Sequence, residues 1–303
     1  MMLSNRASYF LNLATKLRVD RKDGIAPHKP LLLLVVAELA ERGELISRRL
    51  SLSPELTFNF VSFWSVVAAR RPQKPDIRLP FFHLWADGFW LPLDENGAAT
   101  QDRKRTATVE LEDEFWQLLH DDFFREDLRR TLIAKYFTDS GERAALYELV
   151  GLPIPPDSIV QADAKRYETT LERGRNARFR LTVLPAYAYT CALFGFRLTT
   201  LEFETVVDAA HIHQFAKGGN NDPRNGLALS KSAHWMFDRG LWSISDDFRI
   251  LLARDCFTEA GPVPYLLSSF EGREIFLPKN HDYWPHSQYL RWHRDHLFGK
   301  KKF

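Results

Sequence analysis

The strongest constraint on the fold of this chain is one stretch, ETVVDAAHIHQFAKGGNNDPRNGLALSKSAHWMFDRGLW, which begins at Glu204. Thr205 to Ala210 has the composition of a short β-strand, and GLALS, directly after Asn225, predicts a second strand. The segment between them is rich in Gly, Asn, Asp and Pro, which form turns. KSAHWMFDRG then predicts a short helix that ends at Gly240. The stretch therefore predicts the order strand, loop, strand, helix.

Three polar residues stand at the junctions of these predicted elements: His211, Asn225 and His234. Their spacings of fourteen and nine residues, the Gly-Gly/Asn loop and the NGLAL strand before a histidine-bearing helix together resemble the HNH endonuclease family. The resemblance covers Val206 to Gly240. It implies a ββα-metal unit that hydrolyses phosphodiester bonds of duplex DNA.

The resemblance also implies catalytic roles for the three residues. His211 is expected to be the general base, because a neutral imidazole titrates near working pH. His234 is expected to bind a divalent metal ion, Mg²⁺ or Mn²⁺ with other divalent ions open, which binds a phosphate oxygen and the leaving oxygen. Asn225 either completes the metal shell or holds the His211 loop in place, since an amide has both donor and acceptor groups.

The remaining metal ligand is open, because Ala210 stands directly before His211, where many HNH units have Asp or His. Asp208 is the nearest upstream acid, but strand alternation puts it on the face opposite His211 unless a bulge intervenes. Asp238 lies four residues after His234 and shares its helix face. For both carboxylates the alternative is a structural role, in which they cap nearby backbone groups.

Structural zinc, which braces many HNH units through four cysteines, is not expected. The chain has two cysteines, Cys191 and Cys256, and no CxxC pair. Apolar packing is expected to replace the zinc, through Leu193, Phe194, Phe196, Leu227, Leu229, Trp235, Phe237 and Trp242. His213 is expected to leave the site and to make a loop or phosphate contact.

The rest of the chain predicts an α+β fold with a mostly helical N-terminal domain and a small β-hairpin or sheet. Helical patterns cover 4–18, the apolar run of 26–43, 54–69 and 110–137, and two aromatic-rich runs around Ala86-Asp87-Gly88 predict the hairpin. A proline-rich linker at 151–164 is expected to separate domain 1–150 from a nuclease domain, 165–303, with its core at 186–245. The C-terminal extension is expected to be a packed helix around Trp292, His293, Arg294 and His296, with a basic tip at Lys300 to Lys302.

Two motifs of the N-terminal domain, APHKPLLLL and LPFFHLWADGFW, resemble the sulfur-binding domain of phosphorothioate-dependent restriction endonucleases. The resemblance implies a shallow apolar pocket lined by Leu79, Pro80 and His83, with His28 and Lys29 as its polar or cationic rim. Leu79 departs from the family, which often has an aromatic residue there. The alternative is a core hairpin in a DNA-binding domain of another specificity.

The net charge of +2 is too small to predict nucleic-acid binding by itself, so the placement of the positive charges along the chain matters more. The segment KRYETTLERGRNARFRL after the linker is either a solvated helix face or a phosphate-contacting element. The residues expected to contact DNA are Lys165, Arg166, Arg173, Arg175, Arg178, Arg180, Lys217 and Arg224.

These patterns predict a modification-dependent restriction enzyme that cuts double-stranded DNA in defence against foreign DNA. The N-terminus lacks the apolar core of a signal peptide, and the run LLLLVVA is far too short to span a bilayer, so we expect a cytoplasmic protein without membrane contact. A homodimer would supply two units for two strands. The alternatives are a sequence-specific HNH restriction enzyme and a catalytically inactive HNH DNA-binding protein, for which Ala210 is the suggestive feature.

Overall fold

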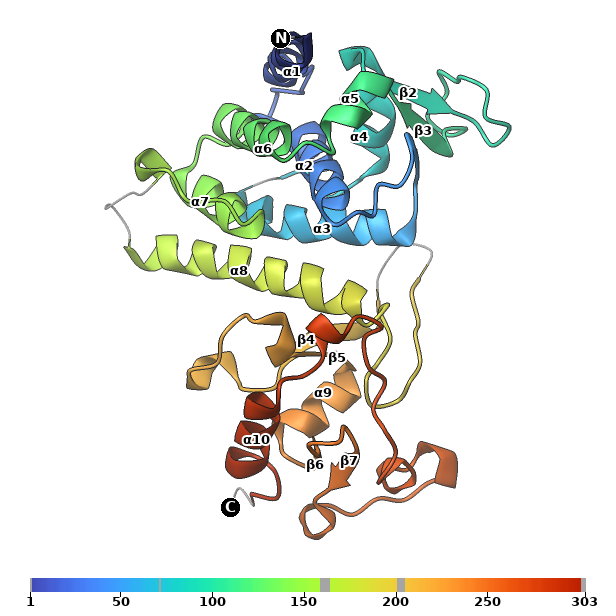
Figure 1. Ribbon diagram of the computed structural model, residues 1–303, viewed down its shortest axis with the longest axis vertical. Coiled ribbons are helices and arrows are strands. Elements are labelled where there is room, and N and C mark those ends of the chain that lie inside the picture. The colour runs from blue at the N-terminus through green and yellow to red at the C-terminus, as the bar shows by residue number, and fades with distance from the viewer. Residues whose placement is uncertain (1, 71, 159–163, 201–204, 301–303) are drawn as a thin grey trace. The chain divides into compact units, whose positions relative to one another are not determined.

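The computed structural model describes residues 2–70, 72–158, 164–200 and 205–300 (Figure 1). The chain divides into two compact units, Met1–Arg178 and Phe179–Phe303. This division falls inside helix α8 (Ala164–Ala186). The domain limits expected from a linker at 151–164 stay a prediction.

The first unit is built around helix α2 (His28–Glu41), whose side chains from His28 to Ala37 are all buried. The helix predicted at 26–43 is thus confirmed. The other helices described in this unit are α1 (Met2–Thr15), α3 (Pro54–Val67), α4 (Arg78–His83), α5 (Asp113–Leu118), α6 (Asp122–Tyr136) and α7 (Ser140–Leu149). Helices α3, α4 and α6 pack against α2, so the core of the unit lies around this helix (Figure 1).

Short polar side chains set the starts of several of these helices. Ser53 precedes α3 and accepts a hydrogen bond from the Leu56 amide at 3.2 Å. Asp121 and Asp139 cap α6 and α7 in the same way. Each cap satisfies an amide that has no partner inside its helix, which is why the helices begin at these positions.

A small antiparallel sheet completes the first unit. Its strands are β1 (Arg49–Ser51), β3 (Thr108–Leu111) and β2 (Trp90–Leu93), in that spatial order. The predicted helix at 110–137 is therefore wrong at its start, because Glu110 pairs with β1 and β2. The rest of that segment forms α5 and α6, as expected.

The predicted hairpin around Ala86-Asp87-Gly88 is wrong. Its first run forms α4 and a 3₁₀ turn, Leu84–Asp87, and only the second run is a strand. Pro80 lies in the first run and has no amide proton for a strand ladder, whereas it fits the first turn of a helix. The indole of Trp90 then donates to the Phe81 carbonyl at 2.7 Å, which ties β2 to α4.

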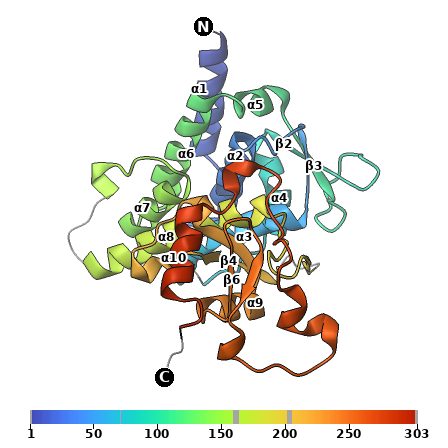
Figure 2. The same cartoon turned by 60° about the horizontal axis from the view of Figure 1, so that its bottom comes forward.

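The second unit contains the predicted order of strand, loop, strand and helix, whose strands and helix are labelled in Figure 1 and seen from a second direction in Figure 2. Strand β4 (Val207–His211) pairs antiparallel with β5 (Gly226–Ser230), and α9 (Lys231–Asp238) follows directly. The Ser230 hydroxyl caps α9 by accepting from the Ala233 amide at 3.3 Å. A second strand pair, β6 (Trp242–Ile244) with β7 (Ile250–Leu252), and helix α10 (Ser287–His296) complete the unit.

Most of the residues predicted to replace zinc do form a core: Leu193, Leu227, Leu229, Phe237 and Trp242 are buried and Phe194 is half-buried. The prediction is wrong for Trp235 and Phe196, which are 53% and 43% exposed. On α9 the inward positions are Ala233 and Phe237. Trp235 lies midway between them, so the helical period turns it to the opposite side.

Helix α10 closes the second unit by burying Tyr289, Leu290 and His293. His293 hydrogen-bonds the Ser243 hydroxyl at 2.8 Å and the Phe237 carbonyl at 3.0 Å. The expected packed C-terminal helix is therefore present, while the tip beyond Lys300 lies outside the described residues. Within the described ranges, every helix is too short or too polar to cross a membrane.

Candidate functional site

The β4–β5 ladder places His211 at the end of its strand. The register runs without interruption from Val207 opposite Ser230 to His211 opposite Gly226, so no bulge occurs in β4. Gly226, the partner of His211 in the register, lies close to side chains of α8. A Cβ at position 226 would stand 2.5 Å from Val183 Cγ2 and 2.9 Å from the Phe179 ring. The absence of a side chain at 226 lets α8 approach the strand pair.

The imidazole of His211 is held from several sides. Its ring stacks on Phe179 with centroids 4.0 Å apart and planes 2° from parallel, and Phe215 lies at 5.8 Å. Burial lowers the pKa of His211, while the hydrogen bond with Asn221 acts in the opposite direction. At neutral pH the ring is therefore uncharged and able to accept a proton.

The partner of His211 also determines which ring nitrogen carries the proton. His211 Nε2 lies 2.8 Å from Asn221 Oδ1. An amide oxygen only accepts hydrogen bonds, so Nε2 is the donor in the neutral ring. The unprotonated nitrogen is then Nδ1, and its lone pair is the one available to a water molecule.

Helix α9 places His234 and Asp238 one turn apart on the same face. His234 Nε2 lies 3.4 Å from Asp238 Oδ2, and Gln214 Nε2 donates to the other carboxylate oxygen at 3.2 Å. His234 lowers the pKa of His211, and Asp238 raises it. The structure thus brings together the predicted base and two of the predicted metal ligands.

Asn225 is fully buried and its amide is engaged by the backbone. Oδ1 accepts from the His213 amide at 2.7 Å, and Nδ2 donates to the carbonyls of His213 at 3.1 Å and Asn220 at 2.8 Å. These bonds connect the start of β5 to both ends of the loop after His211. Of the two roles left open for Asn225, this geometry favours holding the loop.

Asp208 lies on the strand face opposite His211, as alternation predicts in a strand without a bulge. Its carboxylate is 3.9 Å from the Arg180 guanidinium. His213 also turns away from His211: it bonds the Lys217 carbonyl at 3.0 Å and stacks on Trp292 at 3.9 Å. The geometry favours structural roles for both residues.

The side chains near His211 suit a metal ion that takes two ligands from the protein and the others from water and DNA phosphates. Among the residues that the structure describes, no group of three or more His, Cys, Asp or Glu side chains is close enough to hold a metal ion. His234 and Asp238 supply two donors. Mg²⁺ commonly takes one or two protein carboxylates and completes its shell with water and substrate phosphates.

The basic residues predicted to contact DNA have several partners inside the chain. Arg175 lies 3.1 Å from Glu168, Arg178 donates to the Glu148 carbonyl at 3.4 Å, and Arg224 binds Asp222 at 2.7 Å. Arg173 lines a small cavity of about 330 Å³, and Lys217 is exposed. The side chains of Lys165 and Arg166 lie outside the described residues.

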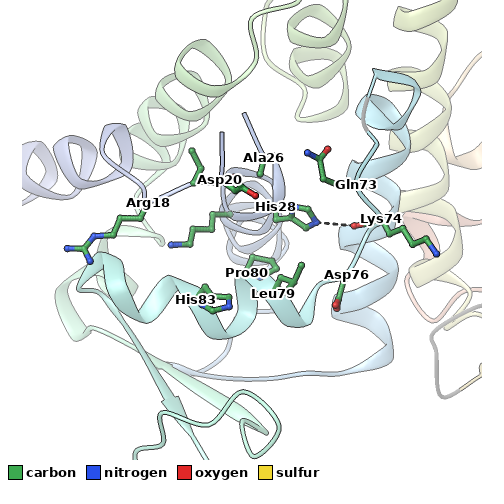
Figure 3. A pocket seen from close by; sticks show the side chains of 12 residues that line it. Arg18, Asp20, Ala26, His28, Gln73, Lys74, Asp76, Leu79, Pro80 and His83 are labelled. Carbon is green, nitrogen blue, oxygen red and sulfur yellow. Dashed lines mark hydrogen bonds between the residues drawn. The ribbon is translucent and has the colours of Figure 1, made fainter. Parts of the chain in front are cut away.

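A cavity of about 610 Å³ opens in the first unit between α2, α4 and two loops (Figure 3). Leu79, Pro80 and His83 on α4 face His28 across it. The residues predicted for the modification pocket all line this cavity: His28, Lys29, Leu79, Pro80 and His83. The structure therefore brings together side chains that are about fifty residues apart in the sequence.

Two polar side chains that line this cavity, Lys29 and His28, have partners inside the chain. Lys29 Nζ donates to Asp87 Oδ2 at 2.6 Å, and this ion pair is nearly buried. His28 bonds the Lys74 carbonyl at 2.9 Å, and burial lowers its pKa, as it does that of His83. The groups just named contribute little net charge to the cavity. Its other charged lining residues are exposed: the cations Arg18 and Lys74 and the carboxylates Asp20 and Asp76.

Sequence reasoning missed several of these residues. Asn221 was visible in the GGNN loop, but only the fold selects it over its neighbour as the partner of His211. Phe179 gave no signal, since its ring meets His211 through tertiary packing. Asp87 stood in the predicted turn, where its pairing with Lys29 was not detectable.

An antiparallel strand pair, its connecting loop and a following helix, with a histidine at the end of the first strand and another on the helix, define a ββα nuclease unit. Residues 191–245 match the family model described as HNH endonuclease. The second unit of this chain therefore contains an HNH endonuclease domain, and this family consists of DNA nucleases.

The chain also has distant likenesses among solved structures. A modification-dependent TagI restriction endonuclease aligns with 40% of this chain and 38% of its own, at 21% sequence identity and a TM-score of 0.31. The chain thus matches well under half of that protein, and a likeness at this level carries no argument about function. No curated protein matches the sequence.

Proposed function

We propose that this protein is a metal-dependent endonuclease that hydrolyses phosphodiester bonds of double-stranded DNA. The observation that carries the proposal is the neutral imidazole of His211 beside the His234–Asp238 pair. Together they supply a base for water and donors for a cation at one end of a strand pair. This combination is what hydrolysis of a phosphodiester requires.

In the proposed reaction, His211 Nδ1 takes a proton from water while the water oxygen bonds to phosphorus. The bond from phosphorus to the 3′-oxygen breaks, and that oxygen takes up a proton from solvent. Asn221 keeps the proton on Nε2 and so leaves Nδ1 basic. Phe179 holds the ring plane, and Asn225 holds the loop that carries Asn221. These contacts keep the His211 ring in one orientation.

His234 and Asp238 would hold the divalent ion, Mg²⁺ or Mn²⁺ or another. When bound, such an ion neutralises charge on the phosphate and on the leaving oxygen. Gln214 orients the Asp238 carboxylate by donating to its second oxygen. Asp208 and Asn225 are less suited to this role, since each is engaged elsewhere.

We further propose that the first unit selects the target by a DNA modification. The support is the cavity that contains His28, Pro80 and His83. A phosphorothioate fits its character, because sulfur is less hydrated than oxygen and prefers an apolar, nearly neutral wall. Of the exposed charged residues that line the cavity, Arg18 and Lys74 can meet neighbouring phosphates, whereas Asp20 and Asp76 face away from them in this proposal.

On this proposal the protein is a restriction enzyme that acts in the cytoplasm against foreign DNA. A homodimer would let two units cut the two strands. The predicted basic residues on α8 and at Lys217 and Arg224 contribute phosphate contacts where their internal partners allow.

The test is digestion of thiolated and unthiolated plasmids of one sequence, with Mg²⁺ and with Mn²⁺. We expect cleavage of thiolated DNA, no cleavage by His211→Ala, and retained DNA binding by that variant. Equal cleavage of both plasmids would favour a sequence-specific enzyme. No cleavage of either, together with metal binding in calorimetry that His234→Ala leaves unchanged, would refute the nuclease proposal.

A further inference from the structure

The outer side of α9 carries an aromatic ring between two cations. Trp235 is 53% exposed, although Ala233 and Phe237 on the same helix are fully buried. The guanidinium carbon of Arg239 lies 4.1 Å from the centre of the Trp235 ring. Lys231 is exposed one turn before the ring. Because positions four apart share a helix face, Lys231, Trp235 and Arg239 form one continuous surface, the α9 ridge.

The α9 ridge borders the candidate catalytic face. His234 directly precedes Trp235, and Asp238 directly precedes Arg239. Consecutive residues of a helix are turned by about 100°, so the ridge and the His234–Asp238 pair occupy adjacent stripes of α9. A DNA strand bound at the catalytic face would run past the ridge.

The α9 ridge combines two cations with an exposed indole, so it suits a ligand that is a polyanion and also has flat apolar groups. Within the part of the chain that the structure describes, Lys231 and Arg239 form no ion pair, whereas Arg175, Arg180 and Arg224 have acidic partners. Trp235 remains 53% exposed although Arg239 lies beside its ring. Exposed aromatic rings bind nucleic acid by contact with bases and sugars, and lysine and arginine bind its phosphates.

We propose that the α9 ridge binds the DNA strand next to the scissile phosphate, with Lys231 and Arg239 on backbone phosphates and Trp235 against a base or sugar. This inference rests on the proposed function and deepens it. The stacked guanidinium holds the indole in one orientation, which lowers the entropy lost on binding. The ridge therefore positions the strand that His211 attacks.

The test is a DNA-binding titration of the full chain with a chelator present, which prevents cleavage, at several salt concentrations. Trp235→Ala should weaken binding about tenfold without changing its salt dependence, and Trp235→Phe should restore most of the affinity. Lys231→Ala and Arg239→Ala should each lower the slope of log K against log salt by about 0.9. The two cation variants test the ridge even if Trp235→Ala affects folding.

Two exposed residues outside α9 provide matched controls: Tyr265, 83% exposed, and Arg254, 57% exposed. Tyr265→Ala and Arg254→Ala should bind DNA like the wild type. If the ridge variants also bind like the wild type while His211→Ala abolishes cleavage, the inference is wrong and the proposed function stands. A wild-type protein that neither binds nor cleaves DNA would overturn both.

Discussion

Replacement of Asn225 by alanine should destabilise the second unit more than any other single change in the loop between β4 and β5. The side chain is fully buried and satisfies one amide and two carbonyls of the loop, at 2.7, 3.1 and 2.8 Å. Each backbone group left without a partner costs about 1–3 kcal/mol when buried. Since His213 and Asn220 border solvent, we take the lower value for each and expect a loss of about 3 kcal/mol.

The assay is urea unfolding followed by tryptophan fluorescence, with Trp242 as the buried reporter of this unit. Asn221→Ala is the matched control, because that side chain makes its described hydrogen bond to His211 alone and should cost about 1 kcal/mol. Asn225→Asp keeps the acceptor but replaces the donor to two carbonyls by a charged oxygen, so it should be no more stable than Asn225→Ala. Equal midpoints for Asn225→Ala, Asn221→Ala and the wild type would refute the argument.

Three further predictions concern stability. Burial lowers the pKa of His293 to about 4, against 6.5 in the unfolded chain. Below pH 6.5 the unfolded state therefore binds more protons than the folded state. The contribution of neutral His293 to the free energy of unfolding is complete above pH 6.5 and is lost as the pH falls to 4. Urea unfolding should show this pH-dependent loss of about 3 kcal/mol in the wild type and not in His293→Gln. Asp87→Asn leaves Lys29 charged and nearly buried, so thermal unfolding of the first unit should lose about 3 kcal/mol, and an unchanged melting temperature would contradict a buried pair. Gly226→Ala places a Cβ 2.5 Å from Val183, so it should cost about 1–3 kcal/mol and slow cleavage, which parallel unfolding and nuclease assays would detect.

The local parts of the nuclease unit were predictable because their signals are local. A β-type run, a glycine- and asparagine-rich loop and an amphipathic segment each specify their own structure through turn chemistry and periodicity. His211 stands at the end of the first strand and His234 inside the helix, so their positions follow once the elements are assigned. The regular β4–β5 register then also fixes Asp208 on the far face, as alternation predicts.

Other features depend on contacts between distant segments. Trp235 is as apolar as Trp242, yet one is exposed and the other buried, because only the packing of α9 on the strands decides which side faces inward. The first aromatic run of the predicted hairpin has β-forming residues, but Pro80 and the docking of α4 on α2 make it helical. Composition alone does not distinguish these outcomes.

The sequence by itself determined the ββα unit and the places of His211 and His234 within it, since short-range periodicity and turn residues are sufficient to specify these elements. Only the tertiary structure decided the orientation, the hydrogen-bond partners and the burial of these side chains. The stacking of Phe179 on His211, the hydrogen bond from His211 to Asn221 and the closure of the His28 cavity join residues from different elements. Such contacts arise from the three-dimensional packing of the elements, and no linear spacing records them.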